Sequence, residues 1–348
     1  MKECDVMKAM VLTELSDLSK NQAPLKLRKV PRPDPAKGEI LIEVSVCGVC
    51  HTELDEIEGR TPPPELPVIP GHQVVGRVTA LGPGVKNVQE GDRVGAAWIY
   101  SACGECRYCR TGQENLCPDF QATGRDADGG YAEFMTVPAD FAHPIPEEFS
   151  DRQAAPLLCA GAIGYRSLRL TGIGKSGRLG LTGFGGSGHL VLKMVTANYP
   201  ALDVYVFARN PRERDFAREL GAVWAGDTAD HAPEKLDAVI DTTPAWKPVV
   251  EALKNLAPGG RLVINAIRKE AGDQDYLMNL NYSRHLWMEK EIKSVANVTR
   301  QDVREFLQLA AEAGLEPETQ EFPLEDANQA VLEIKQGKIR GSKVLVMG

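Results

Sequence analysis

Four cysteines within fifteen consecutive residues constrain this chain more than any other feature. Cys103, Cys106, Cys109 and Cys117 follow the pattern C-x2-C-x2-C-x7-C. Short spacers bring the four thiolates together, and four thiolates around one ion form a closed, tetrahedral zinc site. Because protein fills every position, such a site is structural, and here it would hold a loop that has little apolar material of its own. An iron–sulfur cluster is the alternative that the same ligands allow, and the tetrahedral thiolate set favours zinc.

Composition limits the classes of protein that the chain can belong to. The 348 residues are 43% hydrophobic and 25% charged, which is typical of a globular protein of about two domains. Forty-eight acidic residues against 40 basic ones give a net charge of −8, which disfavours binding to nucleic acid. No uncharged run reaches the ~18 residues of a membrane span, and the first ten residues do not have the apolar core of a signal peptide. We therefore expect a cytoplasmic protein whose cysteines bind metal rather than form disulfides.

The pattern of predicted elements changes near residue 155. Before it, short strands are predicted at Ile40–Val46, Val74–Ala80 and Arg93–Trp98, separated by long loops. After it, strands and helices alternate, which predicts βαβ units and a parallel sheet. The expected elements are a helix at Leu157–Leu170, then strand Arg178–Thr182, helix 187–197, strand Val204–Phe207, helix Pro211–Leu220, strand Asp237–Asp241, helix Val249–Leu256 and strand Arg261–Ala266. Two helices, near 300–313 and 325–337, precede a last strand, Lys343–Met347, that could return to the first half.

A glycine-rich turn joins the strand Arg178–Thr182 to the helix that follows it. Gly183, Gly185 and Gly188 form G-x-G-x-x-G, with Gly186 and Ser187 inside the same turn. In this context the first glycine allows a tight turn, the second a close approach to a pyrophosphate, and the third helix–strand packing. The N-terminus of the helix then offers free N–H groups to phosphates. A plain tight turn is the alternative, and the context favours a dinucleotide-binding site.

The next strand would contact the adenosine end of such a dinucleotide. It ends in Ala208-Arg209-Asn210, where NAD-binding strands usually end in a carboxylate that binds the ribose hydroxyls. Arg209 is followed by Arg212 and Arg214, and guanidinium groups suit a 2′-phosphate. Solvated helix residues are the simpler reading of Arg212 and Arg214. We predict a preference for NADP(H) over NAD(H), with Arg209 and Asn210 at the adenosine end.

Several segments together resemble a known family. The segments Cys47–Leu54, Pro70–Gly76 and Pro156–Gly161, with the cysteine loop and the glycine turn, are similar to the zinc-dependent alcohol dehydrogenases of the medium-chain dehydrogenase family. The cinnamyl-alcohol-dehydrogenase-like branch is the most similar in the glycine turn. The resemblance covers essentially the whole chain and implies an α/β fold in three parts. These are a GroES-like, β-rich catalytic domain at 1–155, a Rossmann domain at 156–298 with a doubly wound parallel sheet, and a C-terminal return to the catalytic domain at 299–348.

The resemblance also implies the residues of the site. Cys50, His72 and Cys159 would bind a catalytic zinc with one open position, giving two zinc ions per subunit, while Cys47 and Cys4 are bystanders. Thr52 matches a hydroxyl that relays the alcohol proton, His51 a residue near the cofactor phosphates, and Glu53 a carboxylate that orients the zinc-binding histidine. The simpler readings are that Thr52 caps a helix and that Glu53 is a solvated acid in its first turn. The resemblance also places Trp98 and Thr61 in the substrate pocket, with a core residue as the alternative for Trp98. It places Arg340 at the cofactor pyrophosphate, in a register that Ser342 could share.

Two residues depart from the pattern of that family. Gln73 stands where the family usually has a glutamate after the zinc-binding histidine, so transient exchange of ligands at the metal is in doubt. Asp55 stands where many members have the final histidine of the proton relay. Asp55, His51 or water would then have to pass the proton out.

The expected function is that of an alcohol dehydrogenase or aldehyde reductase. It would transfer a hydride reversibly between a primary alcohol, aromatic or larger aliphatic, and NAD(P). A sorbitol-type polyol dehydrogenase stays open, whereas the zinc-free quinone reductases lack both cysteine sets. The non-enzyme alternative is a zinc-ribbon interaction module joined to a nucleotide-sensing domain. As partners we expect a small alcohol or aldehyde and, because relatives form dimers or tetramers, further copies of the chain, with no nucleic acid and no membrane.

Overall fold

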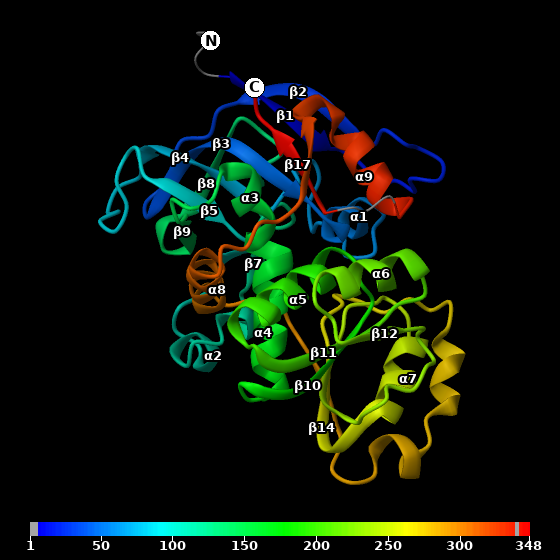
Figure 1. Cartoon of the computed structure of the whole chain (residues 1–348). Helices are drawn as coiled ribbons and strands as arrows, with labels where there is room; N and C mark the ends of the chain where they lie inside the picture. Colours follow the sequence, from blue (N-terminus) through cyan, green and yellow to red (C-terminus); the bar gives the residue numbers. More distant parts are fainter. Residues whose placement is uncertain (1–5, 338–340) are drawn as a thin grey trace. The chain divides into compact units, whose positions relative to one another are not determined.

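The computed structural model describes residues 6–337 and 341–348, which form two compact units (Figure 1). The first unit consists of the described parts of 1–159 and 298–348, and the second of residues 160–297. Cys4 and Arg340 lie outside the described residues. None of the helices in the described part of the chain is long and apolar enough to cross a membrane.

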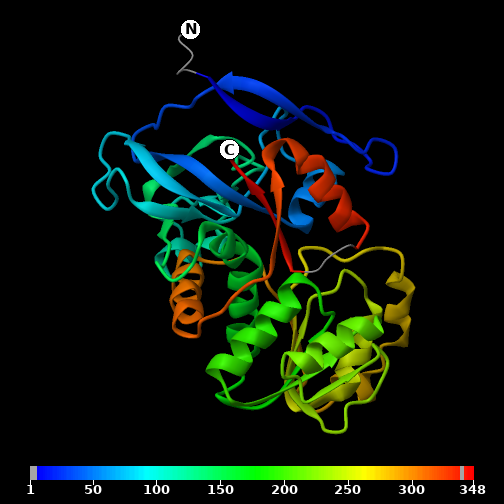
Figure 2. The same ribbon diagram turned by 45° about the horizontal axis from the view of Figure 1, so that its top comes forward.

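A mixed sheet forms the centre of the first unit. Its strand order is β16-β17-β3-β4-β5-β9, and β8 also pairs with β3. The bounds are β3 Glu39–Val49, β4 Val74–Leu81, β5 Arg93–Ala96, β8 Phe134–Pro138, β9 Ala142–Pro144, β16 Thr319–Pro323 and β17 Ser342–Val346. The C-terminal strand β17 runs antiparallel to β3, with Leu345 opposite Cys47, and Figure 2 shows the two side by side. This pairing returns the end of the chain to the sheet that leads into Cys50.

Smaller elements surround this sheet. Two separate two-stranded sheets belong to this unit, an antiparallel pair of β1 (Val6–Leu12) and β2 (Leu25–Pro31) and a short pair of β6 (Ile99–Ser101) and β7 (Gln121–Ala122). The helices are α1 His51–Ile57, α2 Arg107–Arg110, α3 Asp151–Pro156, α8 Arg300–Glu312 and α9 Ala327–Lys335. Helix α1 begins directly after β3 because Cys50 and Glu53 form a capping box, which satisfies N–H groups at the helix start.

The second unit is a doubly wound, six-stranded parallel sheet. Its order is β12-β11-β10-β13-β14-β15, so the chain reverses direction across the sheet between β10 and β13. The strands are β10 Ser176–Thr182, β11 Ala201–Phe207, β12 Trp224–Gly226, β13 Leu236–Asp241, β14 Leu256–Ile264 and β15 Glu291–Ser294, with helices α4 Ala162–Thr171, α5 Gly186–Asn198, α6 Pro211–Glu219 and α7 Lys247–Asn255. The inner strands are nearly continuous apolar runs, as expected for a sheet covered on both faces. The predicted α/β class with a doubly wound parallel sheet is confirmed.

One predicted element differs from the structure. The helix expected at Leu157–Leu170 is α4 preceded by a π-helical turn, Leu157–Gly161, that follows α3 directly. Pro156 has no N–H to donate, so regular helical bonding is interrupted where α3 ends. The wider turn carries Cys159, and such turns are frequent at functional sites.

Candidate metal centres and cofactor turn

Three metal-binding side chains from distant parts of the first unit converge. The donor atoms of Cys50, His72 and Cys159 all lie within 4.8 Å of one another, and Cys50 Sγ is 3.6 Å from His72 Nε2. Cys50 is the N-cap of α1, His72 precedes β4, and Cys159 lies in the π-helical turn. Two thiols and one imidazole form a donor set that suits zinc. The arrangement is that of a three-ligand site, which would leave one position for another molecule.

Glu53 holds two of these residues at once, Cys50 by its backbone and His72 by its imidazole. Its Oε2 accepts the backbone N–H of Cys50 at 2.8 Å, and its Oε1 lies 2.5 Å from His72 Nδ1. Both the Glu53 and His72 side chains are essentially inaccessible to solvent. Burial opposes the charge on His72, but the facing charges of Glu53 and Cys50 outweigh it and raise the pKa of His72 well above its ordinary value. The simpler reading of Glu53 as a solvated acid is therefore wrong, because it is a buried partner of the imidazole.

The thiol of Cys50 is also strongly perturbed. The neighbouring Cys159 thiol, then burial and the charge of Glu53, raise the pKa of Cys50 well above its usual range. Buried groups that disfavour each other's negative charge are stabilised when a divalent cation sits among them. The donor set therefore fits a zinc ion in charge as well as in ligand type.

The two departures from the family pattern have clear local partners. The carboxylate of Asp55 accepts Arg60 Nε at 2.6 Å and is buried on α1. Gln73 is buried with its side chain packed over Gly48, where an added Cβ would lie 2.8 Å from the Gln73 amide oxygen. Glycine at 48 thus makes room for the longer amide side chain.

The proposed relay and pocket residues lie around the same helix. The backbone N–H of Thr52 donates to Cys50 Sγ at 3.3 Å, and His51 is exposed at the start of α1. Trp98 stacks at a tilt on Phe120, with ring centroids 5.3 Å apart. The hydroxyl of Thr61 is buried without a hydrogen-bond partner in the described part of the chain.

Sequence reasoning missed Glu56, a third buried acid on α1 beside Glu53 and Asp55. Both of its oxygens lack hydrogen-bond partners among residues 6–337 and 341–348, although the Trp98 indole is near enough to favour its ionised form. Burial, and then the charge of Glu53, raise the pKa of Glu56 well above its ordinary value. The available signal was the spacing of three residues from Glu53, which places both acids on one side of a helix.

The four-cysteine loop forms a second candidate metal centre. The Sγ atoms of its members lie within 4.8 Å of one another, with 3.6 Å between Cys106 and Cys109 and 3.5 Å between Cys103 and Cys117. Hydrogen bonds from the loop, first from the backbone of Cys109, lower the pKa of Cys106 to about 7, whereas burial raises the pKa of Cys109 to about 12. The loop offers four protein ligands, so the donor set is closed.

The glycine turn has the shape that the sequence predicts. Gly183 has a φ of +79°, and a Cβ there would lie 2.8 Å from Thr242 Oγ1 and from Thr243 Cγ2. Cβ atoms at Gly185 and Gly186 would meet nothing within 4 Å, so the backbone faces open space there, whereas one at Gly188 would lie 2.8 Å from the Gly183 carbonyl oxygen. Helix α5 begins at Gly186, with Ser187 and Gly188 in its first turn. Close packing at Gly183 and Gly188 and open space between them are what a phosphate-binding turn needs.

The residues at the end of β11 divide into two groups. Arg209 and Arg212 are exposed, and Asn210 caps α6 by accepting the N–H of Arg212 at 3.0 Å. Arg214 instead donates Nη1 to the carbonyl oxygens of Ala208 at 2.8 Å and Arg209 at 3.1 Å. Arg214 therefore stabilises the backbone at the strand end, and Arg209 and Arg212 face solvent.

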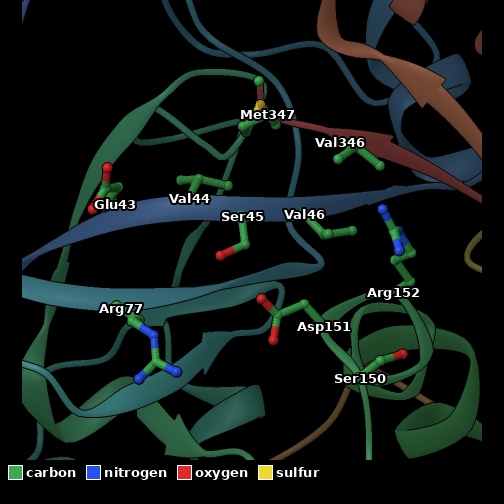
Figure 3. A pocket seen from close by; sticks show the side chains of 11 residues that line it. Glu43, Val44, Ser45, Val46, Arg77, Ser150, Asp151, Arg152, Val346 and Met347 are labelled. Carbon is green, nitrogen blue, oxygen red and sulfur yellow. The ribbon is translucent and has the colours of Figure 1, made fainter.

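A polar surface pocket of about 440 Å³ lies elsewhere in the first unit (Figure 3). Residues 43–46 of β3, Arg77 of β4, the start of α3 at 150–152 and the chain end at 346–348 line it. Two of its charged groups form ion pairs, Asp151 with Arg93 at 2.7 Å and Arg152 with Glu321 at 3.0 Å. None of the metal-binding side chains described above lines this pocket.

Comparison with known proteins decides the family. The alcohol dehydrogenase GroES-like domain matches residues 36–147, and the zinc-binding dehydrogenase domain matches residues 186–312. A probable alcohol dehydrogenase of Mycobacterium tuberculosis is 46% identical over 324 residues, covering 92% of this chain and 91% of that protein. The chain belongs to the zinc-dependent alcohol dehydrogenases. An alcohol dehydrogenase of Geobacillus stearothermophilus is 34% identical over 97% of this chain and 98% of its own length.

Solved structures agree with this family. A cinnamyl alcohol dehydrogenase of Sorghum bicolor has a TM-score of 0.83 at 27% identity, over 98% of this chain and 97% of that one. The predicted membership of the zinc-dependent medium-chain family is confirmed. As a member, this zinc-dependent dehydrogenase is an NAD(P)-linked oxidoreductase that acts on small molecules. The alternative of a non-enzymatic interaction module is not compatible with that membership.

Proposed function

We propose that this alcohol dehydrogenase transfers a hydride between a primary, aromatic or larger aliphatic, alcohol and NADP(H), at a zinc held by Cys50, His72 and Cys159. The convergence of these three donor groups within 4.8 Å, from positions 109 residues apart, is the observation that carries the proposal. The first unit is then the catalytic part and the second the cofactor-binding part. A zinc ion bound there would supply Lewis-acid chemistry to acidify an alcohol or polarise a carbonyl, and a nicotinamide cofactor would supply the hydride acceptor or donor.

The chain's own residues prepare this reaction. Glu53 holds the imidazole of His72 by its Nδ1, so that Nε2 faces the thiols. Thr52, two residues after Cys50, offers a hydroxyl to accept and pass on the proton of the alcohol. The Arg60 guanidinium is paired with Asp55, which makes His51 or water the better candidate for the last step of the relay.

A second zinc ion is proposed in the cysteine loop. Its four thiols form a closed donor set, and of the four cysteines only Cys117 is fully buried, so the loop has little core to hold it. Metal there would stabilise the fold without touching substrate.

The residues that directly follow β11 support the preference for NADP(H). Ala208 is buried where a carboxylate would bind the ribose of NAD, and Arg209 and Arg212 are exposed beside it. A 2′-phosphate would accept charge-assisted hydrogen bonds from these guanidinium groups.

A homo-oligomer is supported by the edge of the parallel sheet. Every residue of the edge strand β15 is exposed, and beside it Trp287 is 55% and Met288 51% exposed. Pairing of β15 with the same strand of a second copy would satisfy open backbone groups and cover these side chains. Sedimentation of the wild type and of Ile292→Lys, which places a charge in that edge, tests this arrangement, and a monomeric wild type would contradict it.

A substrate and cofactor panel tests the reaction itself. The ratio kcat/KM is measured for benzyl alcohol, hexanol, ethanol and sorbitol, each with NADP and with NAD, on protein purified without chelator. We expect benzyl alcohol and hexanol to exceed ethanol, because Thr61 leaves more room than a bulky aromatic side chain would. Preferred turnover of sorbitol would instead favour the polyol dehydrogenase, and no turnover of any alcohol would overturn the proposal.

A further inference from the structure

We propose that Lys269 is a positioning residue for the nicotinamide cofactor. It holds the loops after β13 and β14 together, so that residues 242–246 form a wall of fixed shape beside the glycine turn before the cofactor binds. The inference rests on the proposed binding of the cofactor at that turn. Every residue involved lies in the second unit.

The ammonium group of Lys269 is fully engaged. It donates to the carboxylate of Asp241 and to the carbonyl oxygens of Thr243 at 2.7 Å and Ala245 at 3.0 Å. These three contacts use all three of its N–H donors. The side chain is only 9% exposed, and it lies over the ring of Trp246 at 5.9 Å. A lysine from the loop after β14 thus holds the loop after β13 at three points.

Asp241 extends this contact to a third strand. It ends β13, is inaccessible to solvent, and accepts the hydroxyl groups of Thr182 at 2.5 Å and Thr243 at 2.8 Å. Thr182 is the last residue of β10. The ion pair therefore joins the carboxyl ends of β10, β13 and β14, which are neighbours in the sheet.

The held loop is also the surface on which the glycine turn packs. Thr242 donates its hydroxyl to the carbonyl oxygen of Thr182 at 2.9 Å, and a Cβ on Gly183 would collide with Thr242 and Thr243. A shift of this loop would consequently change the shape of the turn. In doubly wound sheets, ligands bind outside the carboxyl ends of the strands where the strand order reverses, which here is between β10 and β13.

The cluster is a scaffold and does not itself offer groups to a ligand. The hydroxyl groups of Thr182, Thr242 and Thr243 all donate to neighbouring oxygens within the cluster. Further bonds join the same two loops, from Glu270 N–H to the Pro244 carbonyl at 2.7 Å and from Trp246 N–H to Asp273 at 3.0 Å. Lys269 would thus act on the cofactor through the backbone of residues 242–246. It would do so by reducing the number of conformations that this backbone adopts before the cofactor binds.

The test compares Lys269→Met with Lys290→Met. Lys290 also bridges backbone carbonyls in the second unit, those of Leu253 at 3.0 Å and Arg284 at 3.2 Å, but it touches neither crevice loop. If only about a tenth of the molecules keep residues 242–246 in the conformation that binds the cofactor, the Kd for NADPH rises about tenfold. We expect that rise in Lys269→Met by fluorescence titration, together with a higher KM for cofactor and an unchanged KM for alcohol. Amide hydrogen exchange of residues 242–247 in the cofactor-free protein should quicken in Lys269→Met and stay unchanged in Lys290→Met.

Two further variants keep the test decisive. Lys269→Met leaves Asp241 buried without a counter-charge, so the double variant Lys269→Met with Asp241→Asn removes both charges, and Lys269→Arg retains the charge and the donors. We expect the double variant to fold and to bind NADPH weakly, and Lys269→Arg to restore most of the affinity. Wild-type affinity in a folded double variant, an equal loss in Lys290→Met, or a double variant that does not fold would each overturn the inference. A wild type that binds neither NADPH nor NADH would instead contradict the proposed function.

Discussion

Glu53 Oε1 lies 2.5 Å from His72 Nδ1 while Glu53 Oε2 accepts the backbone N–H of Cys50. One buried carboxylate thereby holds the backbone of Cys50 and the imidazole of His72, which belong to different segments of the chain. The capping box that starts α1 and the support of the proposed zinc ligand His72 consequently depend on the same side chain. A change at Glu53 should affect the metal more than the fold.

We expect Glu53→Gln to weaken zinc binding at the Cys50 site by about 10–100-fold, because an amide loses the charge and keeps at most one of the two contacts. The measurement is the rate and extent of zinc transfer to a competing chelator. Glu56→Gln is the matched control, since Glu56 is also a buried acid on α1, its pKa is raised by burial, and an amide has nearly the same shape. Equal zinc retention in both variants would show that Glu53 does not support the metal.

Elemental analysis should find two zinc ions per chain, one in each ligand set. Cys50→Ala should lose one ion and all turnover while remaining folded. Cys106→Ala should lose the other ion and lower Tm by roughly 5–10 °C, because the loop loses the bond that holds it. Iron in place of zinc, or full activity with one ion, would contradict these assignments.

Thr52→Ala should lower kcat about 100-fold with an unchanged zinc content, because the hydroxyl that accepts the proton is lost. Thr52→Ser keeps the hydroxyl and should retain most activity. The contact of Thr52 with Cys50 is made by its backbone N–H, so neither change removes it. Wild-type turnover in the alanine variant would exclude a relay role.

The combined change Ala208→Asp with Arg209→Ile should shift preference towards NADH. A carboxylate accepts the ribose hydroxyl and repels a 2′-phosphate, and loss of the guanidinium removes a charge-assisted bond of about 1–3 kcal/mol. The ratio of kcat/KM for NADPH to that for NADH, at fixed ionic strength, should fall roughly ten- to a hundredfold. A wild type that already favours NADH tenfold would mean that Arg209 is a solvated side chain only.

Stability at mildly acidic pH should depend on His143. Burial, and then the charges of Arg304 and Arg300, lower the pKa of His143 to about 3. The unfolded chain protonates this group near pH 6.5 and the folded chain does not, so the contribution to stability is complete above pH 6.5 and is lost as the pH falls towards 3. Between pH 7 and pH 5 the loss from this group is about 2 kcal/mol.

Urea unfolding of the wild type and of His143→Leu at both pH values measures this loss. Neither ring nitrogen of His143 has a hydrogen-bond partner among the described residues, so leucine removes no bond. The variant should lose about 2 kcal/mol less than the wild type on acidification. The same pH dependence in both proteins would assign the effect to other groups.

Much of the chemistry could be predicted from short segments. The cysteines of residues 103–117 and the glycines of residues 183–188 lie close together in sequence, so local geometry alone brings their functional groups together. The alternation of strands and helices after residue 155 likewise predicted the parallel sheet, because each element carries its own periodicity. The π-helical turn at Leu157–Gly161 was not predictable in this way, since it continues the apolar pattern of α4.

The sequence by itself therefore determined the four-cysteine cluster, the form of the glycine turn and the fold class, each of which depends on local spacing or periodicity. Only the tertiary structure decided that Lys269 pairs with Asp241. It also brings together Cys50, His72 and Cys159, and Glu53 with His72, which the sequence implied only through the resemblance to a family. These contacts join residues 19 to 109 positions apart. They depend on strand register and on the paths of intervening loops, which the packing of the whole unit sets and no local pattern of residues records.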